Sequence, residues 1–413
     1  MPCPFLHQTN VPGCMTNGSL PISAGGFSLE KGEMPRQSVY QTVSRPTTSI
    51  EQLKQHGQSI WLDFIGRGVV RQGEFERLIA EDGPTGVTGN PETFDRVIAE
   101  GHDYDDAFEG LAQIDSHVDA QAIYERIAIV DVRMAADALR TVFDRTHGVD
   151  GFASIGMSPY LAHDTKASIA EARRLCDRVH RPNLMIKVPA TREGIPVIEA
   201  LIAEGINVNV TLVFSPAHYE AVVGAYLRGI ERAPDPRRIA SVVSVPVSRI
   251  DSTVDGELLR IGSPAALSLR GKIAIANAKR IFRRFCNIFH CDRFASLRLR
   301  GVHPQRMLWV SATTENCADS EVRYVEELIG PDTVTTVRLG TLDAFRQQGH
   351  VRGITLHHNP AEAETVLEDL QRVGVDLDTI AEQWQAESVA ALAVSLDNVL
   401  TTLDRRRSAG TRS

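Results

Sequence analysis

The sequence predicts an α/β fold in which eight parallel strands close into a (β/α)8 TIM barrel, with extra C-terminal helices. Two observations support this prediction. From Ile50 onward, short apolar runs alternate with longer stretches of helical periodicity, which is typical of repeated βα units. Eight such runs occur, and 413 residues are enough for a barrel of about 250 residues with additions.

The expected strands are short and mostly apolar. In chain order they are residues 60–64, 86–90, 151–156, 183–189, 207–214, 239–250, 306–311 and 333–339. Helical periodicity predicts crossover helices over residues 120–145, 166–179, 195–204, 217–231, 264–289 and 320–329. Asp164 and Ser215 precede two of these helices as N-cap candidates, and Pro216 suits a first turn.

Residues 362–407 are predicted to form the C-terminal helices. Their apolar stripe is typical of core packing and consists of Trp384, Val389, Leu392, Leu396, Val399, Leu400 and Leu403. Residues 1–45 are rich in Pro, Gly, Ser and Thr, so we expect a disordered N-terminal extension there. We expect residues 46–407 to form a single barrel domain and residues 408–413 to form a flexible tail.

Composition favours a small-molecule partner. The formal net charge is −8 and the basic residues are scattered, which argues against a nucleic-acid partner. No apolar run approaches the about 20 residues that span a bilayer, so we expect no membrane partner. The six cysteines lack CxxC spacing and no basic-then-apolar leader opens the chain, which indicates a reduced, cytoplasmic protein. We expect a monomer or a homodimer.

Lys187 is unusual because it lies within the apolar strand NLMIKVP of residues 183–189. Burial disfavours the charged ammonium, and the neutral amine is a nucleophile toward carbonyl carbon, as in Schiff-base chemistry. The alternative is a structural lysine that reaches solvent or pairs with a carboxylate. Lys187 alone does not distinguish these two interpretations, so the residues near the ends of the other expected strands have to be considered.

Polar residues, Lys187 among them, occur on or just after five of the eight expected strands. A (β/α)8 barrel gathers the carboxyl ends of its strands at one face, where active sites lie. A single Asp or Asn there often caps the next helix, but the joint placement predicts one site. The residues are Asp63, Asn90, Lys187, Asn209, Thr211, Ser244 and Arg249.

Several motifs resemble one known family. LMIKVPAT at 184–191, followed by EGI at 193–195 and GINVNVTLVFS at 205–215, resembles the lysine and following-strand signature of transaldolases. SIWLD at 59–63, GVTGNP at 86–91, AIANAK at 274–279 and YVEELIGPD at 324–332 resemble the longer bacterial branch of that family, from about residue 50 to 405. The resemblance implies a barrel of the Schiff-base aldolase type, without metal or organic cofactor.

The resemblance also implies a reaction. Lys187 would attack the ketone of a ketose phosphate and pass a three-carbon dihydroxyacetone unit to an aldose phosphate, as in the pentose phosphate pathway. Residue by residue, Asp63 would handle the hydroxyl proton at the cleaved bond, Asn90 and Asn209 would hold hydroxyls, Thr211 would orient a proton-relaying water, and Ser244 with Arg249 would contact phosphate. An arginine suits phosphate because its planar fork donates two parallel hydrogen bonds.

Three positions depart from the family pattern. Gly156 stands where the family has a glutamate that shuttles a proton, a function worth about 10²–10⁴ in rate. Pro246 replaces an aromatic residue that lines the pocket, and Glu315 replaces a basic residue that helps to bind phosphate. Arg338 replaces an uncharged residue, and we expect it to pair with Glu315 or to relocate the anion site.

These departures leave several alternatives open. The protein could be the housekeeping pentose phosphate enzyme, a paralogue with a shifted substrate in a specialised pathway, or a catalytically impaired homologue with a binding or regulatory role. A metal site is disfavoured because the pairs His357-His358 and His290-Cys291 lack further ligands at zinc-site spacing. The glycine pairs near residues 66 and 86 form no nucleotide-binding motif.

Overall fold

The computed structural model describes residues 48–63, 66–81, 83–89, 103–104, 119–312 and 320–410. The predicted N-terminal extension, Asn90, Glu315 and residues 411–413 of the predicted tail lie outside these described residues.

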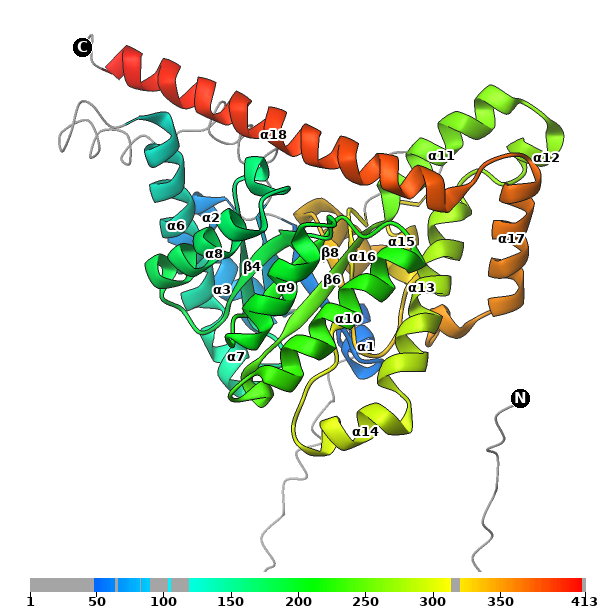
Figure 1. Cartoon of the computed structure of the whole chain (residues 1–413), viewed down its shortest axis with the longest axis horizontal. Helices are drawn as coiled ribbons and strands as arrows, with labels where there is room; N and C mark the ends of the chain where they lie inside the picture. Colours follow the sequence, from blue (N-terminus) through cyan, green and yellow to red (C-terminus); the bar gives the residue numbers. More distant parts are fainter. Residues whose placement is uncertain are drawn as a thin grey trace, which may run out of the picture. The chain divides into compact units, whose positions relative to one another are not determined.

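Eight parallel strands form a closed barrel in the order β1 to β8, which confirms the predicted fold (Figure 1). The strands are β1 Gln58–Leu62, β2 Gly86–Thr88, β3 Phe152–Gly156, β4 Leu184–Pro189, β5 Val208–Thr211, β6 Ser241–Pro246, β7 Arg306–Val310 and β8 Thr333–Val337. Buried parallel strands form from apolar runs because helices cover their outer face and side chains fill their inner face.

Helices surround the barrel in the described ranges. They are α1 Ser49–Gln55, α2 Arg67–Arg71, α3 Glu74–Glu81, α6 Ala120–Ala138, α7 Arg140–Arg145, α8 Thr165–Val179, α9 Gly194–Ala203, α10 Pro216–Arg232, α11 Val247–Ile261, α12 Pro264–Leu267, α13 Ile273–Phe289, α14 Asp292–Leu299, α15 Arg323–Glu327, α16 Leu339–Gln348, α17 Pro360–Arg372 and α18 Leu377–Gly410. Both predicted N-caps are confirmed: Asp164 accepts from the Ala167 amide at 2.9 Å, and Ser215 accepts from the His218 amide at 3.2 Å.

Two predicted boundaries were wrong. The expected strand 239–250 ends at Pro246, and α11 begins at Val247, so Arg249 lies in the first turn of a helix. Pro246 has no N–H for the strand ladder, and Val247, Ile250 and Val254 have helical spacing that the continuous apolar run concealed. The expected helix 264–289 is interrupted by residues 268–272, where Gly271 has a φ of 68°.

Strand register puts an apolar layer below a polar one inside the barrel. A cluster that includes Trp61, Phe152, Met185 and Leu308 fills the interior. Lys187 follows Met185 by two residues and therefore faces the same interior, one layer nearer the carboxyl ends. The apolar layer closes the barrel beneath the polar residues, so a ligand can reach them only from the carboxyl end.

The long helix α18 crosses the carboxyl ends of the central strands (Figure 1). Gln385 donates hydrogen bonds to the carbonyls of Ala190 and Leu212, at 2.9 and 3.1 Å, just after β4 and β5. Trp384 packs edge-on against Phe214 at 5.8 Å between ring centroids. The predicted apolar stripe is confirmed, since most of its members are buried. None of the helices in the described ranges is long and apolar enough to cross a membrane.

Candidate active site

Lys187 lies on β4 with its side chain toward the carboxyl end of the barrel interior. Its Nζ donates a hydrogen bond to the carbonyl of Gly89, at 2.7 Å, just after β2. Burial lowers the pKa of the Lys187 amine, and the nearby Asp63 carboxylate partly opposes this shift. The environment therefore increases the fraction of neutral amine, which is the nucleophilic form.

Asp63 directly follows β1, and its position is fixed by both neighbouring strands. Its amide donates to the carbonyl of Val337 on β8 at 3.0 Å. Its carboxylate accepts from the hydroxyl of Thr88 on β2 at 3.4 Å. Because this carboxylate acts on the pKa of Lys187, the structure brings together two of the predicted site residues.

Asn209 and Ser244 belong to a buried hydrogen-bonded chain across the barrel. Asn209, on β5, donates through Nδ2 to the hydroxyl of Ser154 on β3 at 3.2 Å. Ser244, on β6, donates to the Asn209 carbonyl oxygen at 2.8 Å. Both contacts orient the amide next to Lys187, since Asn209 is its register partner. Buried polar groups that are satisfied in this way are rigid and keep a defined donor and acceptor pattern.

Gly156, Thr211 and Pro246 end strands β3, β5 and β6 at the rim of this site. Gly156 is the register partner of Lys187 and is exposed. Within the described part of the chain, an ideal Cβ at Gly156 would meet no heavy atom within 4 Å. The side of the rim next to Lys187 is therefore open at the position where the resembled family has a glutamate.

Two arginines lie near the rim on either side of β7. Arg249 is the third residue of α11, after β6, and Arg338 is the N-cap residue of α16, after β8. Neither guanidinium has a hydrogen-bond or ion-pair partner in the described ranges. The first turn of α11 has no side-chain cap from Pro246, so its amides and Arg249 together can attract an anion.

Sequence reasoning did not identify Thr88, Gly89 and Ser154, which contact the predicted residues. Ser154 and Thr88 could have been noticed as polar residues within apolar strands, and Ser154 lies two residues before Gly156 on the same strand face. Gly89 acts through its backbone carbonyl, for which the sequence has no signal. Asn90 and Glu315 lie outside the described residues.

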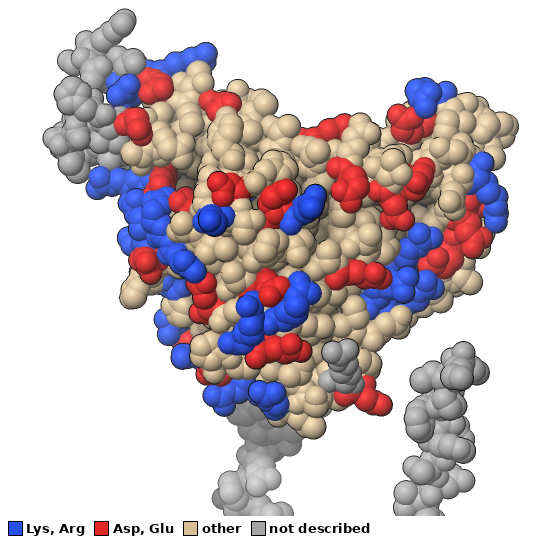
Figure 2. Space-filling model, viewed as in Figure 1, with Lys and Arg blue, Asp and Glu red and all other residues tan. Residues whose placement is uncertain are grey.

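Other parts of the molecule show different chemistry. No group of three or more His, Cys, Asp or Glu side chains is placed to hold a metal among the described residues. His290 instead contacts the carboxylate of Asp332 at 3.2 Å. On the face shown in Figure 2, basic and acidic side chains lie interspersed.

Comparison with known proteins agrees with this architecture. Residues 60–403 match the model of the transaldolase/fructose-6-phosphate aldolase family. Transaldolase 1 of Streptomyces avermitilis is 41% identical over 363 residues, which cover 87% of this chain and 96% of that protein. The transaldolase of Parafrankia sp. is 41% identical over 365 residues, covering 87% and 98%. That of Thiobacillus denitrificans is 40% identical over 351 residues, covering 84% and 97%. The chain therefore belongs to the transaldolase/fructose-6-phosphate aldolase family.

Proposed function

We propose that this chain is a transaldolase-type transferase that moves a three-carbon dihydroxyacetone unit between sugar phosphates, with Lys187 as the Schiff-base nucleophile. The observation that best supports the proposal is the setting of Lys187, a half-buried side chain at the carboxyl end of a barrel whose amine has a pKa lowered by burial. Such an amine is the reactive form in Schiff-base catalysis. The names of the similar proteins point to the same reaction.

In the proposed reaction, Lys187 Nζ attacks the ketone carbon of the donor and water leaves, which forms an imine. Asp63 then accepts the proton of the hydroxyl next to the bond that breaks, and an aldose phosphate departs. The bond electrons remain as an enamine on the lysine. The enamine adds to the aldehyde of the acceptor, Asp63 returns the proton, and water releases the new ketose phosphate from Lys187.

The supporting residues have roles that fit their chemistry. Asn209 can hold a donor hydroxyl because its amide orientation is fixed by Ser154 and Ser244. Asn90 is assigned a similar role, and Thr211 is assigned the orientation of a proton-relaying water. Arg249 and Ser244 are the proposed phosphate contacts, and Arg338 is proposed to compensate for Glu315, by pairing with it or by moving the anion site. A guanidinium and a helix N-terminus both favour phosphate.

Three aspects extend the proposal beyond the reaction. The enzyme would serve the pentose phosphate pathway or a specialised pathway with a related substrate, given the changes at Gly156, Pro246 and Glu315. We propose a cytoplasmic enzyme that acts without a cofactor as a monomer or homodimer. A second candidate is a catalytically impaired homologue with a binding role, which the missing carboxylate at Gly156 favours.

Reductive trapping tests the central claim. The protein is incubated with fructose 6-phosphate or dihydroxyacetone and then with borohydride, which reduces the imine to a stable secondary amine. Intact mass and peptide mapping should find the adduct on Lys187 in the wild type and in the control Lys166→Met, whose lysine is exposed on α8. Lys187→Met should form no adduct. Absence of an adduct with either donor, beside a competent transaldolase, would overturn the Schiff-base function.

A further inference from the structure

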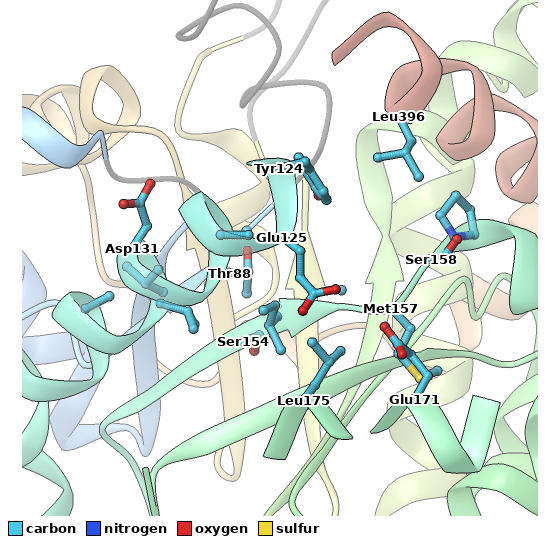
Figure 3. Close-up of a pocket in the computed structure, with 18 of the residues that line it drawn as sticks. Thr88, Tyr124, Glu125, Asp131, Ser154, Met157, Ser158, Glu171, Leu175 and Leu396 are labelled. Atoms are coloured by element: carbon cyan, nitrogen blue, oxygen red, sulfur yellow. The ribbon is translucent and has the colours of Figure 1, made fainter. Parts of the chain in front are cut away.

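A cavity of about 120 Å³ begins at the carboxyl ends of β2 and β3 (Figure 3). Its barrel side is lined by Thr88, Gly89 and Ser154. The carbonyl of Gly89 accepts the hydrogen bond of Lys187 Nζ, and Ser154 holds the amide of Asn209. The inner end of the cavity therefore shares its wall with the proposed reaction site.

The cavity leaves the barrel over the carboxyl edge of β3. Ser154 faces the barrel interior, whereas Ile155 packs in the outer core, and both line the cavity. Farther out, the walls are apolar and come from α6 and α8, through side chains such as Ala128, Val132 and Leu175. The cavity thus connects the polar site with an apolar space between two helices.

Gly156 lies where the cavity crosses this edge. It is in register with Lys187, and a Cβ there would meet nothing within 4 Å among the described residues. A larger side chain at this position would stand in the opening between the amine and the outer space. The absence of a side chain at residue 156 keeps the opening wide.

The lining disfavours a negatively charged occupant. Among the described residues that line the cavity, none is Lys, Arg or His, while Glu125 and Glu171 are present (Figure 3). Arg174 lies outside the lining and holds both carboxylates, at 2.6 Å from Glu125 and 2.8 Å from Glu171. A phosphate entering this space would find no cation to pair with and would have to approach carboxylates.

We propose that this cavity is a substituent pocket of the Lys187 site, which takes an uncharged chain attached to the carbonyl carbon of a ketone donor. The inference rests on the proposed Schiff-base function and adds to its donors hydroxymethyl ketones whose other substituent is an uncharged alkyl chain. The volume is several times what one water needs, so it has room for a chain of a few carbon atoms. The apolar walls favour such a chain by removing it from water.

The test compares trapping of two hydroxymethyl ketones that differ only in the chain on the carbonyl carbon. Hydroxyacetone has a methyl group there, and the longer donor has a butyl chain. In each case the lysine amine adds to the carbonyl, water leaves, and borohydride delivers hydride to the imine. The wild type should trap the butyl donor at least as efficiently as hydroxyacetone.

Two variants shorten the pocket at different depths. Gly156→Leu closes the opening and should reduce trapping of the butyl donor by about tenfold or more while hydroxyacetone is still trapped. Ala128→Phe fills the outer part and should affect only the butyl donor. Gly256→Leu is the matched control, because Gly256 is an exposed helical glycine whose Cβ would also meet nothing within 4 Å among the described residues. This control should trap both donors as the wild type does.

The possible failures are distinguishable. If the wild type traps hydroxyacetone but not the butyl donor, or if Gly156→Leu traps both as well as the wild type, the pocket proposal is overturned and the Schiff-base function stands. If no donor is trapped on Lys187, the proposed function falls and the pocket proposal falls with it. Melting temperatures of all variants identify any that fail to fold.

Discussion

The two ends of the barrel interior differ in the partner that they provide for an ionisable side chain. At the amino end, the Arg306 guanidinium lies 3.4 Å from the Asp150 carboxylate, and both side chains are almost fully buried. Asp150 also accepts hydrogen bonds from Trp61 and Thr85, each at 2.8 Å. At the carboxyl end, the Lys187 amine donates to a neutral carbonyl and its pKa is lowered by burial.

This difference assigns the two ends different tasks: the amino end stabilises the fold, and the carboxyl end holds the groups that react. A buried charge with a counter-ion and satisfied hydrogen bonds stays charged. Removing one of the two partners destabilises the fold, because the other charge is left buried without a counter-ion. An amine whose pKa is lowered by its surroundings has a larger neutral fraction, and the neutral form is the one that reacts. Functional groups of (β/α)8 barrels gather at the carboxyl end, and the opposite end serves stability.

The largest expected effect follows removal of the reactive amine. Lys187→Met should reduce transaldolase turnover by about 10³-fold or more, since no other group can form the imine. The same change should raise the melting temperature, because the native fold disfavours the protonated amine. The folded pKa is below the unfolded value, so this cost is full below the folded pKa and is relieved as pH rises toward the unfolded pKa.

Calorimetric melts of Lys187→Met, wild type and Lys166→Met, from neutral pH to about pH 10, check this prediction. The stability advantage of Lys187→Met should shrink as the pH increases. A melting temperature below that of the wild type at neutral pH would contradict the view that Lys187 is held at a cost to stability.

At the amino end, Asp150→Ala should lower the free energy of unfolding by about 3–5 kcal/mol. The change leaves Arg306 without its counter-ion and removes the acceptor for Trp61 and Thr85. Urea unfolding measures the loss. The control is Asp144→Ala, which removes an exposed ion pair with Arg140 and should change stability by less than about 1 kcal/mol. Equal losses of unfolding free energy in Asp150→Ala and Asp144→Ala would contradict the expectation that breaking the buried ion pair destabilises the fold more than breaking the exposed one.

The expected effect of Gly156→Glu is intermediate. Turnover with fructose 6-phosphate should rise by roughly 10²-fold if the proton relay is all that the site lacks. The open space around Gly156 accommodates the new Cβ among the described residues. Steady-state rates and the trapping rate with dihydroxyacetone check this outcome. An unchanged or lower rate would mean that the site is rebuilt for other donors, as the substituent pocket implies.

The smallest expected effect concerns His290, which contacts Asp332 at 3.2 Å outside the barrel interior. Hydrogen bonds to Asp332 and Cys286 raise the pKa of His290 to about 9. Its folded pKa exceeds the unfolded value, so the stabilisation is full below about pH 6.5 and is lost as pH rises through about 9. His290→Asn should lower stability by on the order of 1 kcal/mol at acidic pH and converge with the wild type above the folded pKa.

Urea titrations at several pH values measure this difference. His350→Asn, at a largely exposed histidine, is the matched control and should stay within experimental error of the wild type. A loss in His290→Asn that does not depend on pH would indicate that packing, and not the charge of the imidazole, stabilises this region.

Much of the fold was predictable because local periodicity reports burial. The eight apolar runs correspond to the eight strands, and the caps Asp164 and Ser215 were found from residue type alone. The boundary at Pro246 was missed because a buried strand followed at once by a buried helix turn gives one continuous apolar run.

The candidate site was predictable only in part. Asp63, Lys187, Asn209 and Ser244 could be named as candidates because polar residues are conspicuous in apolar runs. The Gly89 carbonyl, which accepts from Lys187, was not, since every residue has a carbonyl. The buried pair Arg306 and Asp150 was also missed, because the two residues are far apart in the sequence and neither stands in a motif.

The sequence by itself determined the barrel, the family resemblance and the residue types at the strand ends, because these depend on local pattern and composition. Only the tertiary structure decided that Gly156 lies in register with Lys187, that the amine contacts Gly89, and that a cavity extends from this edge between α6 and α8. Register, burial and empty space arise from contacts between residues distant in the chain. A lysine within an apolar run therefore predicts reactivity, but the size of the carbonyl compound that can reach it depends on the packing around it.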